Sequence, residues 1–195
     1  MTEPWDEWEA PSQSLSRGQD DQLFLKGLRL VREILETIVP AIMIALLINL
    51  FMAQATRVYG QSMEPNLRTN QRLIVEKISY HLHAPRRDDV VVLKLPGEEH
   101  AELLIKRVIG LPGEVVEIKT GHVYVDGTPL NEPFLNQYTK GQMAPQVVPP
   151  LHVFVLGDNR GFSNDSRSFG MVAFSDIVGR AWFSYWPVDR FGFVH

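Results

Sequence analysis

The chain has 195 residues, of which 45% are hydrophobic and 22% are charged, and its formal net charge at pH 7 is −4. This length accommodates one membrane segment and one domain with a substantial core. No basic face emerges for a nucleic acid, whose binding depends on clustered Lys and Arg to displace phosphate counterions. The sequence has no cysteine, which excludes disulfides, thiolate metal sites and cysteine nucleophiles.

The N-terminal part, residues 1–33, is predicted to be an acidic, disordered cytoplasmic tail that ends in a basic segment close to a membrane. Pro4, Pro11 and Gly18 disfavour regular structure, and Arg17 is the only basic residue among the first 22.

A long uncharged run follows the tail. The 20 residues from Thr37 to Thr56 carry no charge, and a helix of this length, at about 1.5 Å per residue, reaches about 30 Å. The run therefore predicts a transmembrane helix over residues 34–56. Two other interpretations remain open, namely a buried core helix and a cleavable signal peptide that ends in Ala53-Gln54-Ala55.

The charges on either side of this run predict its orientation. Lys26, Arg29 and Arg32 precede it, whereas only Arg57 lies close behind it. By the positive-inside rule the N-terminus is cytoplasmic, and everything after Arg57 lies on the trans side, which is periplasmic, extracellular or lumenal.

Residues 57–195 are predicted to form a β-rich domain, because short apolar or alternating runs are separated by Pro and Gly. Asp126-Gly127 is a hairpin signal, and the proline-rich residues 143–150 predict an extended connector. The fold class is mostly β, with an antiparallel, barrel-like domain. The expected strands are Leu73–Val75, Val90–Leu95, Leu103–Ile109, Val115–Ile118, His122–Val125, Val153–Leu156 and Ile177–Trp186.

Aromatic residues gather in the last of these runs. We expect at least half of them to lie in the core, and a membrane-facing position for the tryptophans is the alternative. They are Trp182, Phe183, Tyr185 and Trp186.

Lys106 lies in an apolar run, where it shares one face of the expected strand with Leu104 and Val108. Burial lowers the pKa of a lysine, which matters because an unperturbed lysine is less than about 1% neutral at pH 8. Only the neutral amine serves as a general base. The alternative is that Lys106 reaches solvent or pairs with a carboxylate.

The loop from Gly157 to Gly170 follows an apolar run and is dense in Asp, Asn, Arg and Ser. It is interpreted as an Asx-rich loop that bonds its own backbone or as a shell that fixes a nearby reactive side chain. A calcium loop is disfavoured because Arg160 and Phe162 interrupt the spacing of oxygen ligands. The histidines have no metal-ligand spacing, and no phosphate-binding glycine motif is present, so no metal and no cofactor are predicted.

Three segments in this order, behind one apolar segment, closely resemble the type I signal peptidases, the Ser/Lys proteases that remove signal peptides from exported proteins. They are SMEPNL, KRVIGLPGE and GDNRGFSNDSR. The resemblance covers most of residues 57–187, where VYVDGTPLNEPFL and IVGRAWFSYWP are also similar to family segments.

The resemblance implies a role for each matching residue. Ser62 is the expected nucleophile and Lys106 its general base. Ser163 is expected to hydrogen-bond the lysine amine. Two ion pairs are expected to brace the site, Asp158 with Arg107 and Asp165 with Arg167.

The oxyanion and substrate-binding region is expected at Gly60, Gln61, Met63 and Pro65. The backbone N–H of Ser62 is the expected oxyanion donor. Some family members carry a serine where this chain has Gly60, which leaves the second donor open here. Asp88 stands where the family often has glycine, and only a turn adjustment is expected there.

The implied activity is cleavage of signal-peptide-bearing preproteins after Ala-x-Ala motifs, by a single-pass enzyme in a lipid bilayer. Two alternatives are a soluble Ser/Lys autoprotease of the SOS-repressor kind, with related β architecture, and an inactive membrane-anchored binding module. The apolar segment argues against the first. The sequence leaves the oligomeric state open.

Overall fold

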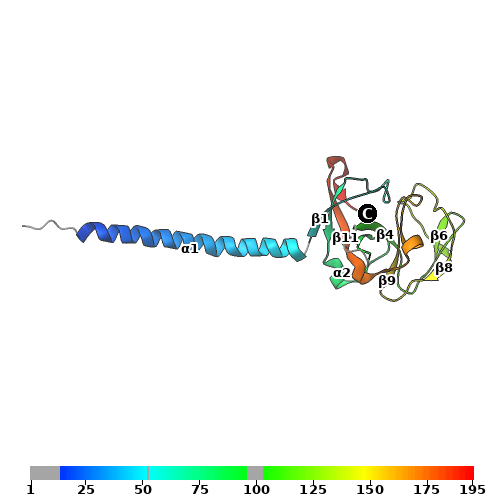
Figure 1. Ribbon diagram of the computed structural model, residues 1–195, viewed down its shortest axis with the longest axis horizontal. Coiled ribbons are helices and arrows are strands. Elements are labelled where there is room, and N and C mark those ends of the chain that lie inside the picture. The colour runs from blue at the N-terminus through cyan, green and yellow to red at the C-terminus, as the bar shows by residue number, and fades with distance from the viewer. Residues whose placement is uncertain (1–13, 52, 96–102) are drawn as a thin grey trace, which may run out of the picture. The chain divides into compact units, whose positions relative to one another are not determined.

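The computed structural model describes residues 14–51, 53–95 and 103–195 (Figure 1). Its Cα positions divide the chain into two compact units, Met1–Leu47 and Ile48–His195.

A single long helix, α1 (Ser14–Phe51), contains most of the first unit. The predicted disorder is therefore wrong for residues 14–33, while residues 1–13 lie outside the described part. Leu, Arg, Lys, Gln and Glu dominate this stretch and all favour helices. An i,i+4 pair, Arg32 Nε to Glu36 Oε1 at 2.6 Å, adds to that preference.

The side chains of residues 26–46 are exposed on every face of α1, including large apolar ones such as Ile38, Ile42 and Leu46. Over the described residues, none of the helices combines the length and the apolar character needed to cross a membrane.

The chain then changes from helix to strand earlier than predicted. Strand β1 (Ala53–Arg57) pairs antiparallel with β2 (Arg72–Glu76), from Ala53 opposite Glu76 to Arg57 opposite Arg72. The predicted helix over residues 34–56 is thus wrong at its C-terminal end, because backbone pairing with β2 holds these residues in a sheet.

The larger sheet is antiparallel and runs β1-β2-β11-β3-β4-β9-β10, with β12 paired to β11. Within the described residues β1 and β10 end this order without pairing to each other, so the expected barrel is not closed by hydrogen bonds. Its further strands are β3 (Val90–Leu93), β4 (Leu104–Gly110), β9 (His152–Leu156), β10 (Val172–Ala173), β11 (Ile177–Trp186) and β12 (Gly192–Phe193).

A smaller antiparallel sheet has the order β7-β6-β5-β8 and lies at the other end of the domain from β1 (Figure 1). The Asp126-Gly127 hairpin forms as predicted, with both residues at positive φ. The segment predicted as a connector instead supplies an edge strand, where proline is tolerated. The strands are β5 (Val115–Lys119), β6 (His122–Val125), β7 (Thr128–Pro129) and β8 (Met143–Val147).

Only single turns of helix occur after residue 57 in the described part of the chain. They are α2 (Ser79–Leu82), α3 (Ser166–Phe169), η1 (Phe174–Asp176) and η2 (Val188–Arg190).

Strand β4 lies where three clusters of buried apolar side chains meet. Ile105 belongs to the cluster around Met63 and Leu73, Val108 to a second cluster, and Ile109 to a third. Its residues are consequently almost all buried. Any polar side chain on β4 must find its partners inside the protein.

The aromatic residues of β11 are less buried than predicted. Trp182 and Trp186 are exposed, while Phe183 and Tyr185 are only half-buried. Phe183 packs edge-to-face against Phe191 and Phe193 from the segment that folds back on β11. This packing is local, because Phe191 and Phe193 belong to the segment that directly follows β11 in the chain.

Candidate active site

The loop that carries Ser62 is anchored by apolar side chains. Met63 and Leu67 are 1% and 3% exposed and belong to the cluster that contains Ile105. Two backbone bonds, from Glu64 N to Gln61 O and from Leu67 N to Met63 O, close successive turns around Pro65. Burial of Met63 thus fixes the backbone beside Ser62, whose own side chain stays half-buried.

Gly60 begins this loop at a φ of +76°. Glycine populates this region without steric cost, whereas most other residues do not. The Gly60 carbonyl accepts a hydrogen bond from the Thr69 hydroxyl at 2.8 Å. The predicted oxyanion region at Gly60 and Gln61 therefore adjoins Ser62 in a defined conformation.

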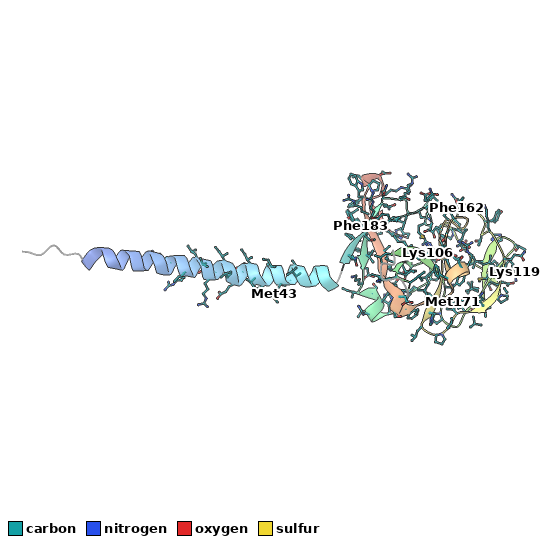
Figure 2. All side chains as sticks on the ribbon, in the orientation of Figure 1. Met43, Lys106, Lys119, Phe162, Met171 and Phe183 are labelled. Carbon is teal, nitrogen blue, oxygen red and sulfur yellow. The ribbon has the colours of Figure 1, made fainter. Side chains whose placement is uncertain are left out.

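Lys106 lies inside the domain, on β4 (Figure 2). Its side chain is 2% exposed, and its Nζ lies 2.8 Å from Ser62 Oγ and 3.0 Å from the Ile105 carbonyl oxygen. Burial lowers the pKa of Lys106 to about 8, although the nearby carboxylates of Asp165 and Asp158 act in the opposite direction. The amine is consequently about half neutral at pH 8.

Arg107, the next residue of β4, forms a buried ion pair with Asp158. Its Nε and Nη2 donate to the two carboxylate oxygens at 2.8 and 2.7 Å, and both side chains are 1% exposed. The guanidinium also donates to the carbonyl oxygens of Asp88 and His195, and it stacks on the Phe134 ring. Nearly every donor of this buried cation is thus satisfied, as a stable buried ion pair requires.

Asp88 adopts a φ of +69°, a value that suits the glycine of the resembling family. The turn is stabilised by a backbone bond from Asp88 N to Val108 O at 2.9 Å. The expected turn adjustment thus presents the Asp88 carbonyl to Arg107.

Asp165 organises the loop from Gly157 to Gly170. Its carboxylate accepts from Arg167 Nε at 2.8 Å and from Gly157 N at 3.1 Å, and it caps α3. Burial alone raises the pKa of Asp165, but the hydrogen bonds from Arg167 and Gly157 outweigh it, so the pKa lies below its ordinary value. The Asp165–Arg167 contact agrees with the predicted pairing.

The hydrogen bond expected between Ser163 and Lys106 is not formed. Ser163 Oγ is buried and has no hydrogen-bond partner among the described residues. It packs instead against Gly157. A Cβ atom added to Gly157 would lie 2.2 Å from Ser163 Oγ and 2.5 Å from the Ser62 carbonyl oxygen, so this packing leaves no room for a side chain at residue 157. Lys106 uses the Ile105 carbonyl in its place.

Two asparagines that hold the Ser62 loop were not predicted from the sequence. Asn159 N donates to the Ser62 carbonyl at 2.9 Å, and Asn159 Nδ2 donates to the Gln61 carbonyl at 3.1 Å. Asn66 bonds Asp158 from the other end of the loop. Asn66 stands in the motif SMEPNL and Asn159 in the motif GDNR. Their positions in these motifs are the sequence feature that could have identified them as site residues.

The burial of Arg160 and its hydrogen-bond partners were not predicted either. Its fully buried guanidinium forms an ion pair with Glu132 and donates a hydrogen bond to Thr139. These contacts connect the loop from Gly157 to Gly170 with the segment between β7 and β8. No pattern in the sequence links these distant residues.

A cavity of about 450 Å³ lies beside that segment, and neither Ser62 nor Lys106 lines it. Across residues 14–51, 53–95 and 103–195, no group of three His, Asp or Glu side chains lies close enough together to hold a metal ion.

Comparisons with known proteins match nearly the whole domain. A family model described as "Signal peptidase, peptidase S26" matches residues 31–186. Signal peptidase I of Leptolyngbya laminosa is 44% identical over 164 residues, which cover 81% of each chain. A probable signal peptidase I-1 of Synechocystis sp. is 38% identical over 168 residues, which cover 83% of this chain and 86% of that protein.

A crystal structure of a signal peptidase I from Enterococcus faecalis V583 is 32% identical and covers 50% of this chain and 97% of that chain, with a TM-score of 0.45. The family model and the curated relatives alone suffice for an assignment, since both extend over about four-fifths of the sequence. The chain belongs to the signal peptidase family, peptidase S26.

Proposed function

We propose that this protein is a membrane-bound serine endopeptidase that removes signal peptides from preproteins after Ala-x-Ala motifs, with Ser62 as nucleophile and Lys106 as general base. The observation that carries the proposal is the 2.8 Å separation of Ser62 Oγ and Lys106 Nζ, with Lys106 as a whole 2% exposed. A buried amine at hydrogen-bond distance from a hydroxyl is the arrangement that general-base activation requires.

In the first step neutral Lys106 takes the hydroxyl proton of Ser62 while Oγ attacks the scissile carbonyl carbon. The tetrahedral intermediate then collapses, the peptide C–N bond breaks, and the protonated lysine returns its proton to the leaving amine. A water molecule, deprotonated by Lys106, attacks the acyl-enzyme ester and releases the signal peptide. The backbone N–H of Ser62 stabilises the oxyanion.

The two ion pairs act behind the reacting groups. Asp158 neutralises Arg107, so that the strand neighbour of Lys106 is fixed by four hydrogen bonds. Asp165 and Arg167 shape the loop that carries Ser163 and Gly157 against Ser62. Met63 and Pro65 shape the loop from the other side, beside the Gly60 and Gln61 backbone that faces the substrate.

The apolar half of α1, residues 34–51, anchors the enzyme in a lipid bilayer, with the N-terminus cytoplasmic and the domain on the trans side. Support comes from apolar side chains that are exposed around the helix, because a helix that is apolar on all faces is found in a protein core or in a membrane. The basic residues Lys26, Arg29 and Arg32 before this half favour the stated orientation.

The proposal is tested with the full chain, purified in detergent, and a preprotein whose signal peptide ends in Ala-x-Ala. Wild-type protein is expected to cut after the motif, as identified by N-terminal sequencing of the product. Ser62→Ala and Lys106→Ala are expected to lose at least about 1000-fold in kcat, as removal of a nucleophile or its base does in other serine proteases. Correct cleavage by either variant at the wild-type rate contradicts the mechanism.

A further inference from the structure

The carboxamide of Asn66 lies where three segments of the site converge. Its Nδ2 donates to Asp158 Oδ2 at 2.8 Å and to the Phe134 carbonyl oxygen at 2.9 Å. A carboxamide nitrogen carries two protons, so each proton has its own acceptor. A hydroxyl at this position has a single proton and satisfies only one of the two acceptors.

The contact with Asp158 connects Asn66 to the strand that carries Lys106. Asp158 Oδ2 accepts from Arg107 Nη2 and from Asn66 Nδ2, at 2.7 and 2.8 Å. Arg107 adjoins Lys106 on β4 and is held by the neighbouring backbone as well. A continuous path of hydrogen bonds therefore runs from the Ser62 loop through Asn66, Asp158 and Arg107 to the strand of the general base.

The other end of the same loop is held by the next residue of the chain after Asp158. Asn159 bonds the carbonyl oxygens of Gln61 and Ser62. Asn159 thus binds the loop at Gln61 and Ser62, and Asp158 binds it at Asn66, beyond Ser62. Of these contacts, the one with Asn66 involves the carboxylate that also pairs with Arg107.

We propose that Asn66 is a positioning residue, which sets the separation of Ser62 Oγ and Lys106 Nζ by locking the nucleophile loop to Asp158. The inference rests on the proposed roles of Ser62 and Lys106. Without the Asn66 donor, Asp158 keeps its two bonds from Arg107, so the ion pair persists while the part of the loop that follows Ser62 loses its bond to Asp158.

The test measures kcat and KM of full-length Asn66→Ala and Asn66→Asp on the Ala-x-Ala preprotein in detergent. Asn66→Asp keeps the shape of the side chain, but it removes the donor and presents a second carboxylate to Asp158. We expect kcat to fall about 10- to 100-fold in both, because small misplacements of reacting groups cost up to about 100-fold, while KM changes less than about threefold.

Asn131→Ala is the matched control. Asn131 is an exposed asparagine in the segment between β7 and β8, distant in sequence from the nucleophile loop. Its kcat and KM are expected to equal those of the wild type.

The pH profile separates positioning from loss of folded protein. Burial lowers the pKa of Lys106, and the Ser62 loop is one of the segments that contact its amine, while Asp165 and Asp158 act in the opposite direction. A released loop admits water, so the acidic limb of kcat/KM moves to higher pH in the Asn66 variants. A smaller folded fraction lowers the rate at every pH and leaves the limb where it is.

Wild-type kcat in both Asn66 variants, or a reduced kcat with an unmoved acidic limb, overturns the positioning role. An equal loss in Asn131→Ala overturns it as well. Cleavage by Ser62→Ala in the same assay refutes the proposed function itself, whereas an inactive Ser62→Ala beside a fully active Asn66→Ala refutes only the inference.

Discussion

Burial of the Lys106 amine lowers the stability of the folded protein at neutral pH. The residue is 2% exposed, and burial lowers the pKa of its amine to about 8. Since the pKa in the unfolded chain is about 10.5, folding disfavours the ionised form. Each factor of ten corresponds to about 1.4 kcal/mol, so the charged amine destabilises the fold by about 3 kcal/mol below pH 8. This cost fades as the pH rises from 8 to 10.5.

Lys106→Met is accordingly expected to be inactive and more stable than the wild type at pH 7, by up to about 3 kcal/mol. Methionine has a similar length and needs no solvation. The measurement is urea denaturation of both full-length proteins in detergent between pH 7 and 9.5. The stability difference should narrow as the pH rises through 8, because the wild-type amine becomes neutral. A constant or widening difference would show that desolvation of Lys106 is not its source.

At the residue scale, resemblance predicted the groups that stand closest together but not how the loop holds them. Ser62 and Lys106 were recognised from their motifs, and the pairs of Arg107 and Arg167 from the same source. The roles of Asn66 and Asn159 were not predicted, because their partners are backbone carbonyls and a shared carboxylate. The positions of these partners depend on the conformation of the loops. Ser163 shows the opposite error, since an expected bond is replaced by one to the Ile105 carbonyl.

At the scale of elements, β11 is the central connection of the larger sheet. It pairs with β2 on one side and β3 on the other, with register shifts against both. Gly179 lies at one of these irregularities, where an added Cβ would stand 2.4 Å from the Glu76 carbonyl oxygen. The close approach of two backbones at this point requires glycine.

Gly179→Ala should therefore lower the free energy of unfolding by about 1–3 kcal/mol, the usual cost of overpacking. Thermal unfolding followed by tryptophan fluorescence measures the effect. Gly161→Ala is the control, because its Cβ would meet only the flexible Lys140 side chain at 3.7 Å. Equal melting temperatures for the two variants would mean that β11 and β2 can separate without cost.

Alternation and turn residues were enough to predict most strands of the domain to within a few residues. β1 was assigned to the helix because its residues continue an uncharged run, and hydropathy does not distinguish a strand from the end of a helix. β8 was taken for a connector because Pro145 argues against a central strand, although an edge position accommodates it. Both errors reflect pairing with distant segments, which a local pattern does not contain.

At the scale of the whole molecule, the proposed membrane anchor and the proposed catalytic site belong to different parts of the chain. The apolar half of α1 precedes a domain that has its own three core clusters. Attachment should therefore respond to changes in α1 that leave the domain intact.

The double variant Ile42→Lys/Ile44→Lys is expected to lose membrane attachment, because each lysine at the centre of a membrane helix costs about 2.5–3.5 kcal/mol. Leu28→Lys/Leu30→Lys, which changes the polar half of the same helix, is the control and should stay attached. The assay is the fraction of protein that remains in membranes after alkaline carbonate extraction. Complete release of the wild type, or equal retention of both doubles, would contradict anchoring by this half.

The place of β11 between β2 and β3 also has a consequence for synthesis of the protein, because Ser62 and Lys106 come together only once β11 has been made. Chain order and sheet order differ here, since residues 177–186 fill the gap between strands that end at residues 76 and 93. Without β11, the sheet consists of two separate halves. The Ser62 loop connects β1 and β2 in one half, and Lys106 lies on β4 in the other. Proteolysis is therefore expected only after residues 177–186 have left the ribosome and joined the two halves.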